Sequence, residues 1–205
     1  MKTILWDFDG VILDSMTVRD WGFEEIFKSF DKEKVKELLD YHRFNGGLSR
    51  YVKIRYFFEK ILKRQISDEE ILEYASRFSE IMLKELINPK NIIQETLEFI
   101  KNNYKKYNFH IVSGSDGKEL NFLCEKLNIS DYFISIQGSP TPKNTLVEVL
   151  LKENNYDLKE TCLIGDSIND YEAASKNKIL FFGFNNRSLL NLEPSYIESF
   201  NNFQF

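Results

Sequence analysis

The order of apolar and polar residues divides the chain into two kinds of sequence. From about residue 89 onward, short apolar runs alternate with stretches of helical periodicity, and the run at residues 3–6 is of the same apolar kind. Alternating strands and helices are typical of a mostly parallel sheet with helices on both faces. The later apolar runs lie at 109–112, 132–136, 161–164 and 179–182, and the helical patterns lie near 94–107, 117–127, 143–155 and 168–177.

Residues 16–88 show almost only helical periodicity, over 17–30, 32–42, 49–64 and 67–87. Asn88-Pro89 is a natural end to the last of these helices, because the residue before a proline disfavours the helical conformation. We therefore expect an α/β protein. Its Rossmann-like, doubly wound core would comprise residues 1–15 and 89–205, with a small helical domain, residues 16–88, inserted after the first strand.

Two pairs of residues have the spacing of a capping box, in which an N-cap side chain and an acid three residues later bond each other's backbone N–H groups. They are Ser67 with Glu70, and Asp116 with Glu119. Each pair predicts the start of a helix.

Polar residues follow the apolar runs at the points where the predicted strands end. In an open parallel sheet, ligands bind beyond the carboxyl ends of the strands, so we expect these side chains to lie together. Two carboxylates on one face repel each other unless a cation or a shared proton relieves them, and residues two apart on a strand share a face. The residues are Asp7 and Asp9, Ser113 and Gly114, Lys143, and Asp166 and Asp170.

This combination of residue types suits phosphoryl transfer. An aspartate carboxylate can act as the nucleophile and form an aspartyl-phosphate. Mg²⁺ binds a few carboxylates together with substrate phosphate, and it offsets the negative charge of the transferring group. A lysine, a hydroxyl and backbone N–H groups can hold the phosphoryl oxygens. A second carboxylate can protonate the leaving group and then activate water.

Composition narrows the remaining classes of function. The formal net charge of −5 argues against a nucleic-acid-binding surface. The N-terminus lacks the apolar stretch of a secretion signal, and no apolar run is long enough to cross a bilayer. Cys124 and Cys162 lie in apolar segments and are expected to be buried free thiols. We expect a cytoplasmic protein with no membrane or nucleic-acid partner.

The polar strand ends together resemble the four motifs of the haloacid dehalogenase superfamily of Mg²⁺-dependent phosphohydrolases. In chain order the matching stretches are WDFDGVIL, HIVSGS, TPKNTLVEVL and CLIGDSINDYEAA. The helical insert resembles the superfamily's helical cap of the type placed after the first strand. Within the superfamily the chain resembles phosphoglycolate phosphatases and β-phosphoglucomutases.

The resemblance implies a role for each matching residue. Asp7 would be the nucleophile and an Mg²⁺ ligand, and Asp9 the general acid/base with its backbone carbonyl on the metal. Asp166 and Asp170 would be metal ligands, and which of them binds directly is left open. Ser113, Gly114 and Lys143 would bind the phosphoryl oxygens. Asp9 also favours phosphoester chemistry, because the dehalogenases lack this second aspartate.

In similar capped members a loop of the cap projects over the core site and selects the substrate. Gly46-Gly47 interrupts the helical pattern and marks such a loop, so Arg43, Asn45 and Arg50 are the candidates for this role. Arg50 could bind a second anionic or hydroxyl-rich group. We expect a small phosphorylated metabolite as the substrate, such as a sugar phosphate or a phosphoglycolate-like molecule.

Three functions fit the motifs. The first is a Mg²⁺-dependent phosphatase of a small phosphomonoester. The second is a sugar phosphomutase of the β-phosphoglucomutase type, which shares every motif but returns the phosphoryl group to a sugar. The third is a signalling module phosphorylated on aspartate, although such modules lack an inserted helical cap and a first-strand D-x-D motif. We expect the phosphatase.

Overall fold

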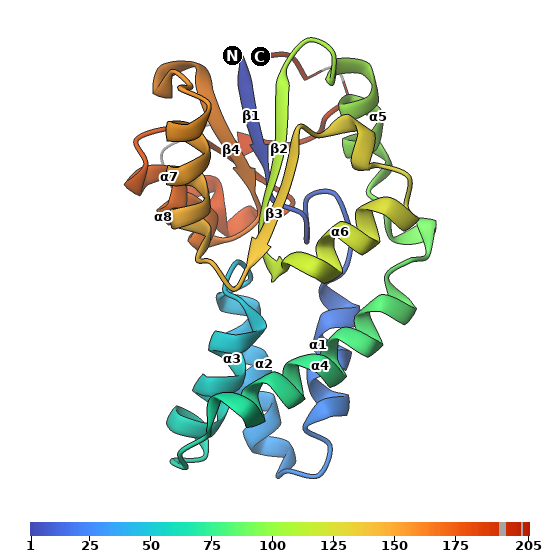
Figure 1. Cartoon of the computed structure of the whole chain (residues 1–205), viewed down its shortest axis with the longest axis vertical. Coiled ribbons are helices and arrows are strands. Elements are labelled where there is room, and N and C mark those ends of the chain that lie inside the picture. The colour runs from blue at the N-terminus through green and yellow to red at the C-terminus, as the bar shows by residue number, and fades with distance from the viewer. Residues whose placement is uncertain (193–195, 202) are drawn as a thin grey trace.

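A computed structural model describes residues 1–192, 196–201 and 203–205. Its centre is a sheet of six parallel strands in the order β3-β2-β1-β4-β5-β6, as Figure 1 shows. This order confirms the doubly wound α/β fold expected from the alternating pattern. The strands are β1 (Thr3–Trp6), β2 (Asn108–Asp116), β3 (Ser135–Ser139), β4 (Thr161–Gly165), β5 (Leu180–Phe184) and β6 (Tyr196–Ile197).

Helices cover both faces of the sheet. Successive residues of a strand point to opposite faces, and in β1 the residues on both faces are apolar and need to be covered. Ile4 and Trp6 of β1 pack into a cluster with α5 (Gln94–Asn103) and α6 (Gly117–Lys126). Leu5 joins a second cluster with α7 (Lys143–Glu153) and α8 (Ile168–Lys176). Short 3₁₀ helices complete this part at Pro89–Asn91, Ser130–Tyr132, Leu158–Glu160 and Arg187–Asn191.

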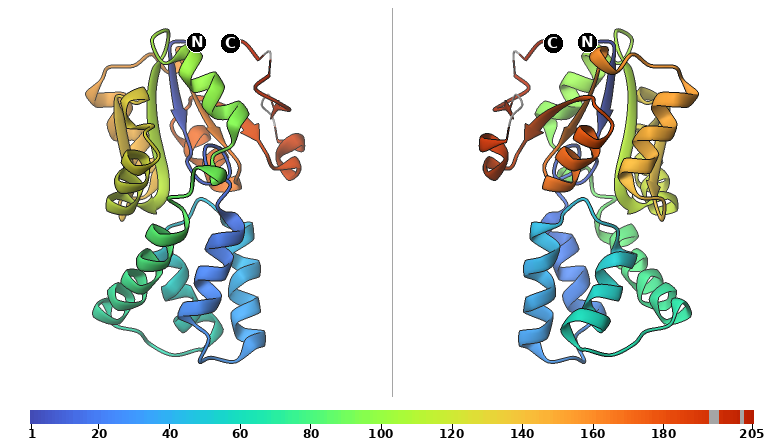
Figure 2. Two further views of the ribbon diagram at one scale, coloured as in Figure 1. Left: turned by 90° about the vertical axis from the view of Figure 1, so that its right-hand side faces the viewer. Right: turned by 90° about the vertical axis from the view of Figure 1, so that its left-hand side faces the viewer.

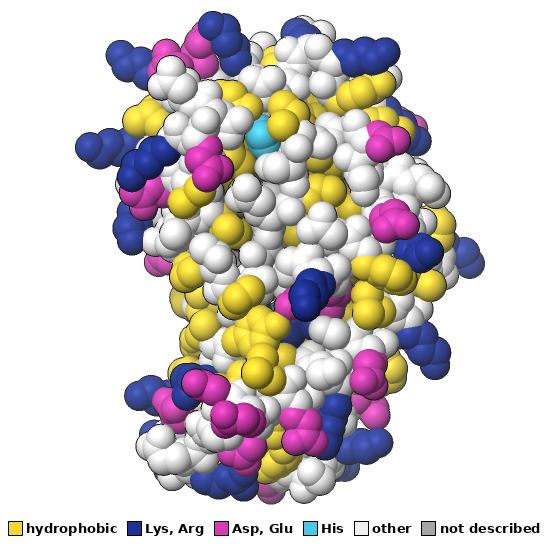
Figure 3. All heavy atoms as spheres, in the orientation of Figure 1, with side chains coloured by type: hydrophobic (Ala, Val, Ile, Leu, Met, Phe, Trp, Pro, Cys, Tyr) yellow, Lys and Arg dark blue, Asp and Glu magenta, His cyan; other side chains and the backbone are white. Residues whose placement is uncertain are grey.

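The insert between β1 and β2 is a helical bundle beyond the carboxyl ends of the strands, where Figures 1 and 2 show it on its own side of the sheet. Its interior is rich in phenylalanine, including Phe23, Phe27, Phe57 and Phe78. On the face drawn in Figure 3 the molecule narrows where the bundle meets the sheet part. The helices are α1 (Met16–Ile26), α2 (Lys32–Phe44), α3 (Arg50–Tyr56) with a π-helical continuation at Phe57–Ile61, and α4 (Asp68–Glu85).

One of the two predicted capping boxes is present. Ser67 and Glu70 bond each other's backbone N–H groups at the start of α4. Asp116 caps α6 by accepting from the N–H groups of Lys118 and Glu119. The Glu119 side chain, however, pairs with two arginines of the bundle instead of returning to the cap. The capping-box prediction for Asp116 and Glu119 is therefore wrong.

Within the described residues, no helix is both long enough and apolar enough to cross a membrane. Cys124 and Cys162 are both free and buried, as expected.

Candidate active site

Asp7 is the first residue after β1 and is only 3% exposed. One carboxylate oxygen, Oδ1, accepts from the backbone N–H of Phe8 at 2.8 Å and lies 2.8 Å from the Lys143 Nζ. Gly10 then turns the chain with a φ of +74°, which favours glycine. A Cβ at Gly10 would also lie 2.0 Å from a carboxylate oxygen of Asp166, so this glycine leaves room for that acid.

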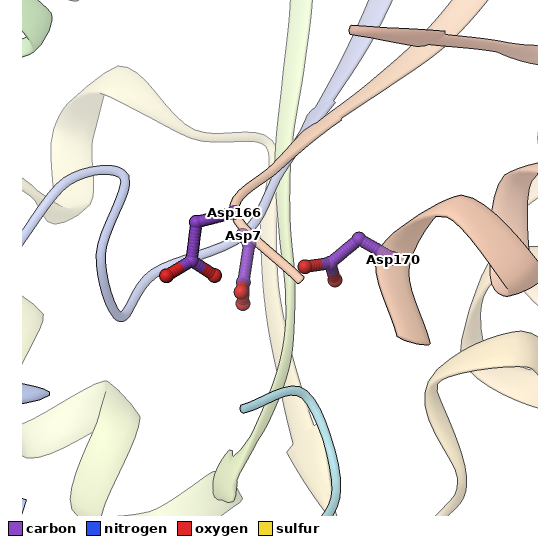
Figure 4. A group of neighbouring side chains, drawn as sticks. All are labelled: Asp7, Asp166 and Asp170. Carbon is purple, nitrogen blue, oxygen red and sulfur yellow. The ribbon is translucent and has the colours of Figure 1, made fainter. Parts of the chain in front are cut away.

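Three aspartates meet beyond the carboxyl ends of β1 and β4. Asp7 follows β1, Asp166 follows β4 and Asp170 projects from the first turn of α8, and Figure 4 shows the three carboxyl groups facing one another. One carboxylate oxygen from each lies within 4.8 Å of the others, which is close enough for a shared metal ion. The structure therefore brings together residues that are far apart in the sequence, as the strand-end pattern predicts.

Lys143 begins α7 and lies between two of these acids. Its ammonium group pairs with Asp7 and with Oδ1 of Asp170. The other Asp170 oxygen accepts from the backbone N–H of Ser167 at 3.0 Å and from its hydroxyl at 2.6 Å. Both oxygens of Asp170 thus have protein donors, and Asp170 fixes the direction of Lys143.

Burial makes the carboxyl groups of Asp7 and Asp166 costly to ionise. Burial, with repulsion from Asp170, raises the pKa of Asp7 to about 7 even though Lys143 opposes the change. Burial and the charges of Asp7 and Asp170 raise the pKa of Asp166 well above its usual range. The pKa of Lys143 is raised, because attraction to Asp170 and Asp7 outweighs the effect of burial. A cation between the carboxylates would favour their ionised forms.

The carboxylate of Asp9 turns toward other partners. Its Oδ2 accepts from the Ser115 hydroxyl at 2.5 Å, and its Oδ1 accepts from Arg19 Nε at 2.6 Å and from the Ser15 hydroxyl. Burial raises the pKa of Asp9, but Arg19 and the three hydrogen bonds outweigh it, so the pKa is lowered overall. The prediction that Asp7 and Asp9 share one face of a strand is wrong, because β1 ends at Trp6.

The carboxyl end of β2 supplies hydroxyl groups to the same place. Ser113 is 1% exposed, and its Oγ accepts from the backbone N–H of Ser115 at 3.1 Å. Ser113, Gly114 and Ser115 line one cavity together with Asp7 and Asp166. Sequence reasoning named the first two and missed Ser115, although it stands two residues after Ser113 in the same motif.

A family comparison identifies this arrangement. The family model described as haloacid dehalogenase-like hydrolase matches residues 4–184. The chain belongs to this family. The superfamily resemblance drawn from the four motifs is thereby confirmed, and the chain is a haloacid dehalogenase-like hydrolase. A search of curated proteins gives no match.

Solved structures of the same fold cover nearly the whole chain. The β-phosphoglucomutase of Clostridium difficile has a TM-score of 0.80 and 17% identity, covering 100% of this chain and 94% of its own. CbbY from Rhodobacter sphaeroides, solved with phosphate, has a TM-score of 0.76 and 17% identity, covering 98% and 96%. A predicted phosphoglycolate phosphatase from Haemophilus somnus has a TM-score of 0.73 and 16% identity, covering 98% and 95%. At such identities the likeness shows the fold alone.

The helical bundle of this hydrolase forms the opposite wall of the cavity. Of the three predicted cap residues, Arg50 lines the cavity and is buried. Arg43 is instead half-exposed and paired with Asp20, and the Asn45 side chain donates to the Tyr41 carbonyl. Among the described residues neither Arg43 nor Asn45 lines this cavity, and a role for them in substrate selection stays a prediction.

The loop between α2 and α3 touches the strand ends directly. A Cβ at Gly114 would lie 2.2 Å from the Gly47 carbonyl oxygen, and one at Gly47 would lie 2.9 Å from the Asn169 Cβ. Only glycines allow the two backbones to come this close. The bundle is therefore closed over the strand-end residues in this structure.

Proposed function

We propose that this hydrolase is a Mg²⁺-dependent phosphatase that cleaves a small phosphomonoester through an aspartyl-phosphate on Asp7. The observation that carries the proposal is the environment of Asp7. It is a buried carboxylate paired with Lys143 at 2.8 Å, within 4.8 Å of two further acids and in one cavity with Ser113.

The donor set fits a hard divalent cation. The carboxylates of Asp7 and Asp166 are crowded and buried, and burial together with repulsion from neighbouring carboxylates raises their pKa values. We assign them, with the Asp9 backbone carbonyl, as the Mg²⁺ ligands. Asp170 would orient Lys143 and would not bind the metal itself, because Lys143 and Ser167 already occupy its two oxygens. When bound, Mg²⁺ would neutralise charge on the carboxylates and on the phosphoryl oxygens.

The residues of the chain then divide the chemistry between them. A carboxylate oxygen of Asp7 attacks phosphorus, and the bond from phosphorus to the leaving oxygen breaks as Asp9 gives that oxygen a proton. Water next attacks the aspartyl-phosphate and passes a proton to Asp9, which regenerates Asp7. Ser113, the Gly114 N–H and Lys143 hold the phosphoryl oxygens. The lowered pKa of Asp9 beside Arg19 favours its ionised carboxylate, the form that accepts a proton in the second step, so the proton donated in the first step would reach Asp9 from the bound phosphomonoester monoanion.

The test is phosphate release from a panel of small phosphomonoesters, with and without Mg²⁺. We expect metal-dependent release that falls by about a thousandfold or more in Asp7→Asn, since the nucleophile is lost. Asp14→Asn is the matched control, because Asp14 is an exposed aspartate just after the same turn. Absence of release from every ester by folded wild-type protein would contradict the proposal.

Two other outcomes have distinct signatures in the same assay. Isomerisation of a sugar phosphate without phosphate release would identify a phosphomutase. A stable phosphorylated Asp7 without turnover would identify a signalling module.

A further inference from the structure

We propose that Glu119, on α6 of the sheet part, is a positioning residue for the acid/base Asp9 and acts through Arg19 of the bundle. This inference rests on the proposed function, because it assigns the group that keeps Asp9 in place for proton transfer to the leaving oxygen. Glu119 is not among the described residues that line the cavity, so its effect on the reaction has to pass through Arg19, which does line it.

The side chain of Glu119 does not serve the helix that carries it. Glu119 stands in the first turn of α6 and is only 2% exposed. An acid at this position ordinarily stabilises a helix by returning to the N-cap or by facing the helix N-terminus from solvent. Here Asp116 caps α6 without it. Burying a carboxylate costs free energy unless it is paired, so the pairing of Glu119 points to a role outside its own helix.

Glu119 belongs to a row of alternating charges that ends at the acid/base. Its Oε2 lies 2.7 Å from Arg50 Nη1, and its Oε1 accepts from Arg19 Nη1 at 3.2 Å. Arg19 in turn donates from Nε to Asp9 Oδ1 at 2.6 Å. One guanidinium therefore bridges the two acids, and Glu119 fixes the end of that guanidinium that Asp9 does not hold.

The two arginines depend on Glu119 to different extents. Arg50 has a second partner, because its Nη1 also donates to the Ser79 hydroxyl at 2.6 Å. Among the described residues, the Arg19 side chain hydrogen-bonds only to Asp9 and Glu119. Without the charge of Glu119, two buried guanidinium groups would repel each other with no carboxylate between them. Arg19 is the one with fewer other contacts, so it is the one that would shift.

The position of Arg19 decides which oxygen of Asp9 carries the transferred proton. A guanidinium only donates, so Oδ1 beside Arg19 stays an acceptor. Oδ2 faces the Ser115 hydroxyl at 2.5 Å, and a hydroxyl can reverse its hydrogen bond and accept. The proton that Asp9 passes to the leaving oxygen is therefore held on Oδ2. A shift of Arg19 would remove this distinction between the two oxygens.

The experiment compares two esters of similar size whose leaving groups need a proton to different extents. We would measure kcat/KM, which covers the steps up to release of the alcohol, for ethyl phosphate and trifluoroethyl phosphate. Ethoxide is the poorer leaving group, because it lacks the fluorine atoms that stabilise negative charge. Glu119→Gln should lower kcat/KM for ethyl phosphate by about 10-fold to 100-fold and for the fluorinated ester by about threefold or less, since a misplaced proton donor slows the needier leaving group more.

Two further variants control for charge and for folding. Glu125→Gln removes an exposed acid from the same helix and should leave both values unchanged. Arg50→Met/Glu119→Gln removes one charge of each sign, which keeps the charge balance where the single variant does not fold. The same difference between the esters is expected in this double variant, because Arg19 still lacks Glu119. Thermal unfolding checks that each variant is folded.

Crystal structures of wild type and of the folded Glu119 variant separate this inference from the proposed function, because they require no turnover. Arg19 Nε is expected to leave Asp9 Oδ1 in the variant. Equal losses for the two esters, or an Arg19–Asp9 contact that persists without Glu119, would overturn the positioning role even if wild type releases phosphate normally. Absence of release by wild type would contradict the proposed function, and the crystal structures would still decide whether Glu119 holds Arg19 on Asp9.

Discussion

Asp7 and Asp9 are the same residue type two positions apart, yet their environments shift their pKa values in opposite directions. The pKa of Asp7 is raised to about 7 by burial and by Asp170, whereas Arg19 and three hydrogen bonds lower that of Asp9. Opposite shifts in pKa of this kind allow two neighbouring carboxylates to play different chemical roles. A cation beside Asp7 would favour its ionised form, whereas the lowered pKa of Asp9 favours its ionised form until a proton reaches it from the substrate.

The raised pKa values of Asp7 and Asp166 predict how Mg²⁺ changes stability with pH. Between about pH 4 and pH 7 the folded protein keeps a proton on Asp7 that the unfolded chain releases, so the metal-free protein loses stability as pH rises through this window. Mg²⁺ bound at the proposed site would compete with those protons and would stabilise only the folded form. Added Mg²⁺ should therefore raise Tm more at pH 8 than at pH 5, by at least about 3 °C.

Differential scanning fluorimetry with and without Mg²⁺ measures this difference. Asp7→Asn should show a smaller Mg²⁺ effect and a flatter pH dependence, because the titrating ligand is gone. An equal rise in Tm at both pH values, or a full Mg²⁺ effect in the variant, would mean that the cation binds elsewhere.

The residues of the site differ in how far the sequence alone could predict them. Asp7, Ser113 and Asp166 stand at or just after the ends of apolar runs, and Lys143 follows the loop beyond the run at 132–136, so all four can be predicted from where the strands end. Arg19, Lys53 and Glu119 lie within helices, where a charged residue is normally on the solvated face. Their burial arises from the packing of the bundle on the strand ends, and no periodicity within one helix reveals that contact.

At the scale of elements, strand positions depend on partners as well as on apolar runs. The apolar run at 132–136 predicts a strand, but β3 begins at Ser135, where it pairs with His110 of β2. Residues Ser130–Tyr132 form a helical turn instead. The register with β2 decides where β3 starts, and a single run carries no information about its neighbour.

The close contact between Gly114 of β2 and the α2–α3 loop predicts how one substitution would affect the closure of the bundle over the strand ends. Gly114→Ala would place a Cβ 2.2 Å from the Gly47 carbonyl, a backbone atom that cannot move without the loop. We expect the bundle to close less well and kcat/KM for phosphate release to fall by at least about tenfold. Gly46→Ala is the matched control, because its Cβ would meet only the Ser167 Cβ, at 3.4 Å. Equal activity of the two variants would show that this contact is not required.

At the scale of the whole molecule, two segments of the chain connect the bundle to the sheet part. Residues of both parts line the cavity. We propose that residues 16–88 are a separate cap domain that moves on the core of residues 1–15 and 89–205. The cap contributes Arg19, Arg50 and Lys53 to the cavity, and the core contributes Asp7 and Asp9. A substrate held from both sides can reach its place only if the two parts separate first.

A disulfide across the cap and the core would test this movement. The Cβ atoms of residues 46 and 167 would lie 3.4 Å apart, near the spacing of a disulfide, so Gly46→Cys/Ser167→Cys should form a bond in the closed arrangement. The native Cys124 and Cys162 are buried and would not compete. We expect oxidation of the double variant to abolish phosphate release and a reductant to restore it, while Gly46→Cys alone is unaffected by oxidation. Mass spectrometry confirms the bond, and full activity of the bonded protein would mean that substrate reaches Asp7 without any opening of the cap.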